Sequence, residues 1–246
     1  MTGTMPATAA RIAPSRLALA AWLAVVAPML LAPRPAAAFW LLGFAPADTL
    51  PPGGFAAIAG TGGQYSSVGN PQRSSFTPFL PHAGLRYGFA DGWDIGYRLT
   101  QVALPYSGVG PSLGGEIDVK HRLTPPGATW QAAIVLGAAY SYLDISGASK
   151  SAYSPGIDLV VSRKLTPHAT LISELRYVYT AIPSAAGGAR GNYVHAAGVD
   201  LGARFGLTRT VSLTPEVGVF DFTGGLRGRT ANGVAAQYGA VLGFGF

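Results

Sequence analysis

The stretch QYGAVLGFGF, residues 237–246, decides the fold that we expect for this chain. Alternate positions carry Tyr238, Leu242, Phe244 and Phe246, whereas the residues between them are uncharged and, apart from Gln237, small. A period of two is typical of a β-strand with one apolar face. Such a strand cannot be a loose tail, so its apolar face must be covered.

The composition indicates what covers it. Charged residues make up 11% of the chain, against about 25% in ordinary soluble domains. Glycine occurs 34 times, aromatic residues make up 11%, and cysteine is absent. After residue 38 no segment reaches the roughly 18 consecutive apolar residues of a membrane helix. This combination favours a transmembrane β-barrel, whose signal is spread over many short alternating strands.

The N-terminus has the order of a secretory signal peptide. Two arginines precede the apolar run LALAAWLAVVAPMLL (17–31), and three alanines, Ala36 to Ala38, follow it. A positive, an apolar and a small-residue region in this order predict export and cleavage. The alternative is a membrane anchor, but the run is short and contains a proline. We expect a mature chain that starts near Phe39.

Cleavage there would remove three of the 17 basic residues and none of the 11 acidic ones. The sequence pI of about 9.7 therefore overstates the basicity of the mature chain, and we expect no nucleic-acid partner.

A repeated pattern follows. Four stretches begin with arginine, contain a tight polar turn and continue as an alternating run: RYGFADGWDIG (86–96), RLTPPGATWQA (122–132), RKLTPHATLIS (163–173) and RFGLTRTVSLT (204–214). A solenoid or propeller would also repeat at this distance. Here each period holds two strands, a short turn and a longer Gly/Ser/Pro-rich loop. Unequal connections of this kind are typical of outer-membrane barrels.

Between the turn and loop residues the sequence predicts ten strands, and eight or twelve are the alternatives. The ten predicted strands are 55–66, 76–89, 93–102, 112–122, 129–142, 153–165, 169–180, 192–206, 210–221 and 234–246. Long loops are expected at 67–75, 103–111, 143–152, 181–191 and 222–233. The predicted fold class is all-β, an up-and-down antiparallel transmembrane barrel. The predicted organisation is a signal peptide (1–38), a periplasmic N-terminal segment (39–53) and the barrel (54–246).

One face of the strands has the pattern of a lipid-facing surface. Aliphatic residues are flanked by aromatic ones at about the spacing of an apolar band with aromatic girdles, which is ~25 Å tall. The expected girdle residues are Trp93, Trp130, Tyr140, Tyr142, Tyr177 and Tyr179.

The other face carries seven acidic and seven basic residues: Arg86, Asp94, Arg98, Glu116, Asp118, Lys120, Arg122, Asp158, Lys164, Glu174, Arg176, Asp200, Arg204 and Glu216. An Arg or Lys facing lipid at mid-bilayer would cost about 2–4 kcal/mol. This face must therefore be the lumen, and we expect its charges to pair across it.

TLPPGGFAAIAGTGG (49–63), RYGFADGWDIGYRL (86–99) and the C-terminal YGAVLGFGF resemble bacterial outer-membrane β-barrel proteins, in particular small porin-like or transporter-like barrels. In that superfamily the terminal Phe and the alternating residues before it are read by the barrel-assembly machinery. The resemblance implies this assembly role for Tyr238, Leu242, Phe244 and Phe246. It also implies the outer membrane as location and its lipid as a partner.

The residues do not favour an enzyme. Ten strands is also the count of the omptin proteases, which use an Asp pair and an Asp-x-His pair at the outer rim, but neither pair occurs here. A lipid A-modifying enzyme would need a group such as His195 with Ser184 at the outer interface. The histidines show no metal-ligand spacing, so we expect no catalytic residue, no metal and no cofactor.

The expected function is a narrow, charge-paired lumen that passes or binds small solutes. Two alternatives stay open. One is a non-conducting structural or surface-interaction barrel, and the other is an outer-membrane protease or lipid A-modifying enzyme. An eight-stranded barrel is filled by its own side chains, whereas sixteen or more strands leave a water-filled channel. Ten strands lie near the filled end.

Overall fold

The computed structural model describes residues 43–68, 73–102, 109–110, 112–145, 148–185, 188–226 and 228–245. The predicted signal peptide and Phe246 lie outside these ranges. The strands are β1 (Phe55–Val68), β2 (Arg73–Ala90), β3 (Trp93–Val102), β4 (Val109–Gly110), β5 (Ser112–Arg122), β6 (Trp130–Ile145), β7 (Ala148–Thr166), β8 (Ala169–Ala181), β9 (Tyr193–Gly206), β10 (Val211–Leu226) and β11 (Arg229–Phe244).

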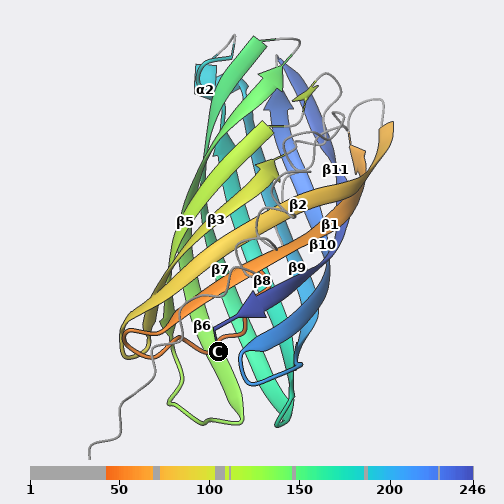
Figure 1. The fold of residues 1–246 in the computed structure, drawn as a ribbon. Helices are drawn as coiled ribbons and strands as arrows, with labels where there is room; N and C mark the ends of the chain where they lie inside the picture. Colours follow the sequence, from red (N-terminus) through yellow and green to blue (C-terminus); the bar gives the residue numbers. More distant parts are fainter. Residues whose placement is uncertain are drawn as a thin grey trace, which may run out of the picture. The chain divides into compact units, whose positions relative to one another are not determined.

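The ten long strands form a closed antiparallel barrel (Figure 1). Each long strand pairs with the next along the chain, and β11 closes the wall by pairing with β1 from Ala57↔Phe244 to Val68↔Gly233. The predicted fold class and strand count are confirmed. The two-residue strand β4 pairs with β6 and lies within the predicted loop 103–111. Closure covers the C-terminal strand on both edges and leaves its apolar face on the outside.

Two predicted long loops are largely strand. The β6–β7 ladder continues to Ile145↔Ala148, and the β10–β11 ladder continues to Leu226↔Arg229. The prediction of loops over 143–152 and 222–233 was therefore wrong. Their Gly- and Ser-rich sequences suggested breakers, but ladder hydrogen bonds join backbone groups and do not require apolar side chains.

One short helix, α2 (Gly188–Gly191), lies between β8 and β9. Among the described residues no helix is long and apolar enough to cross a membrane.

Prolines interrupt the ladder on one side only. Pro155 pairs with Ala138 on β6, whereas the β7–β8 register passes from Tyr153 to Gly156 without it. Pro215 likewise pairs with β11 but is passed over in the β9–β10 register. A proline has no N–H to donate, so each of these strands keeps its place through its other neighbour.

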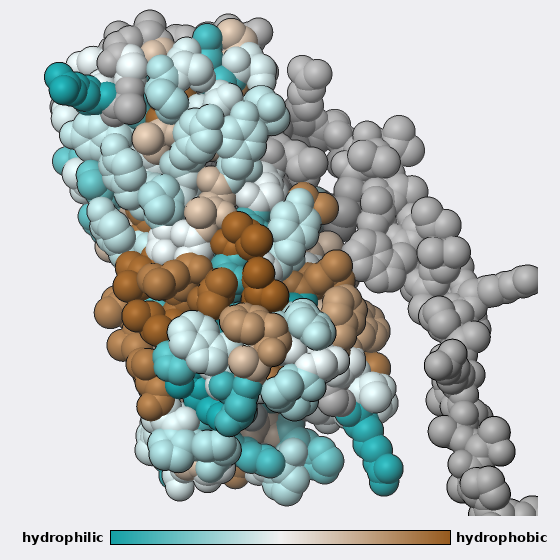
Figure 2. Space-filling model, turned by 90° about the vertical axis from the view of Figure 1, so that its left-hand side faces the viewer, coloured by the Kyte–Doolittle hydropathy of each residue, from teal (hydrophilic) through white to brown (hydrophobic). Residues whose placement is uncertain are grey.

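The outer face is apolar around the middle. On the face that Figure 2 shows, hydrophobic side chains gather in a belt, with paler and hydrophilic residues above and below. Leu136 and Leu175 are 57% and 56% exposed. The six predicted girdle residues all point outward. Arg163 lies over the ring of Trp130 at 5.1 Å, and His121 stacks on Trp93 at 3.9 Å. Both polar side chains lie at strand ends, where amphipathic groups reach the membrane interface.

Three of the four predicted assembly-signal residues, Tyr238, Leu242 and Phe244, are exposed on the outside of β11. Phe246 lies outside the described residues. Recognition by the assembly machinery stays a prediction.

Spin labels on adjacent residues of one strand test the two faces of the wall. A label at Leu136 or Leu175 should be accessible to oxygen in lipid and inaccessible to a water-soluble relaxation agent, because both side chains point outward. Labels at the inward neighbours Val135 and Glu174 should not show lipid exposure. The opposite pattern would invert the barrel.

Candidate functional site

The predicted charges converge in the lumen because the strand alternation turns them away from lipid. Asp94, Lys120, Glu174 and Arg176 are each at most 4% exposed. The structure divides the paired charges into two networks.

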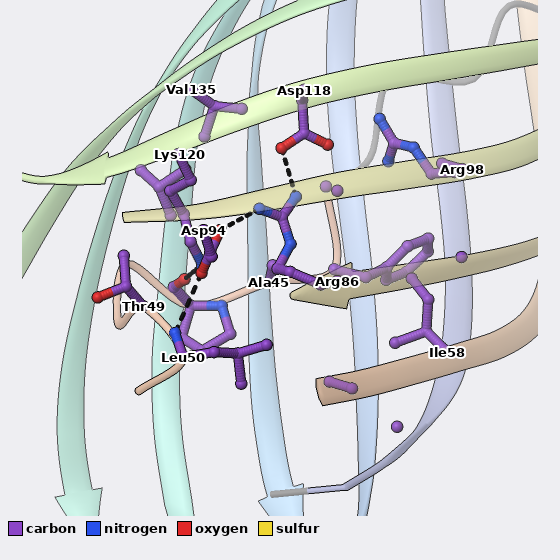
Figure 3. Close-up of a pocket in the computed structure, with 18 of the residues that line it drawn as sticks. Ala45, Thr49, Leu50, Ile58, Arg86, Asp94, Arg98, Asp118, Lys120 and Val135 are labelled. Carbon is purple, nitrogen blue, oxygen red and sulfur yellow. Dashed lines mark hydrogen bonds and ion pairs between the residues drawn. The ribbon is translucent and has the colours of Figure 1, made fainter. Parts of the chain in front are cut away.

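The first network joins β2, β3 and β5 near the short turns (Figure 3). Arg86 bridges two carboxylates, Asp94 through Nη1 and Asp118 through Nη2 at 2.5 Å. The ammonium of Lys120 lies 3.6 Å from the second oxygen of Asp94. Gly96 faces this bridge, and a Cβ there would collide with both Arg86 and Asp118. The network therefore depends on a glycine as well as on its charges.

The second network crosses the lumen. Glu116 on β5 accepts from Arg98 on β3 at 2.7 Å and from Arg176 on β8 at 2.8 Å. The Arg176 Nε lies 3.0 Å from an Asp158 oxygen. Gly137 on β6 lies opposite Asp118 on β5 and opposite Gly156 on β7. Because neither glycine has a side chain, space is left in the lumen for the long side chains of this network. A direct bond from β5 to β8 shows that the lumen is narrow here.

The remaining predicted lumen charges lie at different depths in the barrel, some at the short-turn end and others buried in the lumen. Arg122 pairs at 3.1 Å with the exposed Asp91 at a short turn. Lys164 is exposed and Arg204 is half-buried toward the same end. Asp200 and Glu216 are buried on β9 and β10. The seven acidic and seven basic residues of the predicted inner face are therefore equal in number overall but not at each depth of the barrel.

Residues 43–50, which we call the inner segment, lie inside the barrel. The inner segment is fixed mainly through its backbone. Lys120 Nζ donates to the carbonyls of Asp48 and Pro46, at 2.6 and 3.0 Å. The backbone N–H groups of Leu50, Ala47 and Phe44 donate in turn to Asp94 (3.1 Å), Ser162 (3.1 Å) and Glu216 (2.9 Å).

Apolar contacts complete the docking. Ala47 is fully buried in a cluster with Ala133, Val135, Val160 and Ile172. The Phe44 ring meets the ring of the buried His82 edge to face, with 5.0 Å between centroids.

The sequence predicts a periplasmic N-terminal segment over 39–53, and the lumen contacts of residues 43–50 were not predicted. The available signal was its composition, since Asp48 is the only charged residue in an otherwise largely apolar stretch. A solvated tail would be polar.

A cavity of about 360 Å³ remains beside the inner segment. Its lining includes Arg86, Asp94, Glu116 and Asp118 from the wall, and Phe44 and Thr49 from the inner segment. The space is large enough for a small polar solute and is bordered by both signs of charge.

The outer half of the lumen is filled differently. Phe220, Phe222 and Leu143 are fully buried there. Gln237 donates to Gln64 at 2.8 Å across the β1–β11 seam. The inner segment therefore occupies the lumen on the short-turn side, and buried wall side chains pack on the other.

The residues weighed for catalysis lie elsewhere. His195 is on the outer face, where its Nδ1 lies 2.6 Å from the Tyr177 hydroxyl. The Ser184 hydroxyl accepts from the backbone of Ser151. Among the described residues, no three His, Asp or Glu side chains are arranged to hold a metal ion.

No family model matches the chain, and no curated protein matches it. Solved structures do. The outer membrane protease OmpT from Escherichia coli has a TM-score of 0.51 at 10% identity, over 81% of this chain and 100% of that one. The COG4313 outer membrane channel from Pseudomonas putida F1 has a TM-score of 0.47 at 12% identity, over 80% and 97%.

Identities this low report the fold and not the activity. The closed ten-stranded wall, the apolar outer belt and the likeness to OmpT together make this chain an outer-membrane β-barrel in fold.

Proposed function

We propose that the protein is a gated outer-membrane pathway for small solutes, and that the structure describes its closed state. The observation that carries this proposal is the inner segment. It occupies the lumen beside a cavity and is held there mainly by hydrogen bonds of its backbone.

The wall does not need the inner segment for closure. All ten strand pairs form without it, since residues 43–50 contribute no strand to the ladder. Its attachment consists of hydrogen bonds of its backbone and of a small apolar surface formed by Phe44, Ala47 and Leu50. Elements with few buried apolar contacts open at a lower free energy than the core of a fold. Release of the inner segment would therefore leave the barrel intact and widen the lumen next to Arg86 and Lys120.

The charged lumen also favours a pathway over a purely structural barrel. Replacing buried ion pairs by well-packed apolar residues is often neutral or stabilising, so stability alone does not call for a charged interior. A polar lining lets water and a solute enter once the inner segment moves. Catalysis remains the weakest alternative, because His195 and Ser184, the candidate pair, lie in separate contacts.

Changing Ala47 tests the gate. Ala47→Asp would place a carboxylate in the cluster with Val135 and Ile172, and the inner segment should dock less well because a buried charge is costly there. In planar bilayers we expect rare openings of the wild type, and openings of the same unit size but higher frequency in the variant.

The matched control is Pro52→Asp, an exposed position just outside the inner segment, which should behave like the wild type. If neither the wild type nor folded Ala47→Asp ever opens, the barrel is non-conducting. A large, permanently open wild-type conductance would equally end the proposal.

A second prediction concerns the cross-lumen network. Glu116→Gln leaves Arg98 and Arg176 without their shared carboxylate, and breaking a buried pair from one side costs about 3–5 kcal/mol. We expect a loss of this size in the free energy of unfolding by urea. Asp91→Asn at the exposed rim pair should cost less than about 1 kcal/mol. Equal effects of the two substitutions would show that the lumen pairs are not buried.

A further inference from the structure

A row of two bases and two hydroxyl groups crosses the inner face of β7 to β10, close to the short turns. Lys164 is directly opposite Thr170 in the β7–β8 ladder, and Thr170 is directly opposite Arg204 in the β8–β9 ladder. The β9–β10 register, which continues unchanged past the proline of β10, places Thr214 opposite Arg204. We call Lys164, Thr170, Arg204 and Thr214 the basic row.

All four side chains belong to the lumen face. Arg204 and Thr214 line the cavity beside the inner segment. Lys164 is two residues from Ser162, whose hydroxyl accepts from the inner segment, and therefore shares its face. Neighbouring strands lie about 4.8 Å apart, so the backbones of the two bases, with β8 between them, are about 10 Å apart. Lysine and arginine side chains are long enough to meet at one ligand across this distance.

The acidic residues on the inner face of these four strands all lie deeper in the lumen. Counted from the short turns along β7, β8, β9 and β10, the first of them are Asp158, Glu174, Asp200 and Glu216. The wall of this sector therefore carries only positive charge at its short-turn end. A cleft lined by one sign of charge concentrates small ions of the opposite sign, so this end of the cavity favours anions.

The inner segment supplies one carboxylate to this region. Asp48 is its only charged residue, lines the same cavity and attracts the Arg204 guanidinium electrostatically. The backbone carbonyl of Asp48 is fixed by Lys120, whereas its side chain is exposed. Attraction between exposed charges contributes little free energy. An anion that enters the cavity can therefore take the place of this carboxylate.

The chemistry of the basic row suits an oxyanion. A guanidinium presents a planar fork of donors that matches a carboxylate or a phosphate, an ammonium adds a point charge, and each hydroxyl adds a donor. The cavity of about 360 Å³ has room for the rest of a small molecule. We propose that the basic row binds the oxyanion of a small solute, a carboxylate or a phosphate, in competition with Asp48.

This site names the class of solute for the pathway proposed above, and it rests on that function only where transport is concerned. Binding is measured without conduction, so the two claims fail separately. A barrel that binds the anion but never opens would end the gated pathway and leave the site. A barrel that opens but binds no anion would do the reverse.

Equilibrium dialysis of the membrane-extracted, detergent-solubilised protein tests the site, with radiolabelled inorganic phosphate in one arm and radiolabelled malonate in the other, at constant ionic strength. Arg204→Gln should weaken binding at least about tenfold, because it removes a charged hydrogen-bond donor. Lys164→Gln, at an exposed position where folding is not at risk, should weaken it as well. The matched control is Arg209→Gln, which removes the same charge from the exposed β9–β10 turn, outside the cavity lining, and should bind like the wild type.

Asp48→Asn should bind the anion more tightly than the wild type, because the competing carboxylate is gone. Asp91→Asn neutralises a carboxylate at the same end of the barrel, where it pairs with Arg122, and should leave the affinity unchanged. Equal affinities of these two variants would overturn the competition with Asp48.

The site itself is overturned if neither the wild type nor Asp48→Asn binds either anion at millimolar concentrations. It is also overturned if Arg204→Gln and Lys164→Gln bind as well as Arg209→Gln. Binding of phosphate alone identifies a phosphorylated solute, binding of malonate alone identifies a carboxylic acid, and binding of both identifies a site for either oxyanion.

Discussion

A charged side chain on a barrel strand cannot face hydrocarbon, and this constraint determines the rest of the structure. It turns the charged residues inward, into a lumen too narrow to hydrate them separately. They must then find partners on distant strands, as Glu116 does with Arg98 and Arg176. Glycines such as Gly96 keep the space that these bonds need.

The strands and their faces could be predicted from the sequence because both follow from a local period of two. The ion-pair partners of the lumen charges could not be predicted in this way. Along β5, Glu116 and Asp118 precede Lys120 and Arg122, and this order does not say which strand supplies each partner. The structure pairs these acids with arginines of β2, β3 and β8. Partner choice depends on register and on the barrel's circumference, which no single strand encodes.

The position of each charge along the barrel axis could not be predicted either, for the same reason. Arg122 and Asp200 belong to one predicted face, yet the first lies at the rim and the second is buried. The inner segment was missed because it has no period at all. Its hydrogen bonds come from its backbone, which leaves little trace in the choice of residues, apart from the low charge.

The inner segment gives the lumen a feature that a purely structural barrel would not require. It is an occupant beside a cavity, bound mainly through its backbone. Proteins depart from the most stable arrangement mainly where function requires it.

The most direct measurement of the central claim is disulfide formation between the inner segment and the wall. The chain has no cysteine, so paired substitutions introduce the only thiols. The Ala47 N–H lies 3.1 Å from the Ser162 hydroxyl, and Val161 points to the outside. In isolated outer membranes, Ala47→Cys with Ser162→Cys should oxidise to an internal disulfide, whereas Ala47→Cys with Val161→Cys should not. Absence of the first disulfide, or equal yields of both, would contradict an inner segment bound within the lumen.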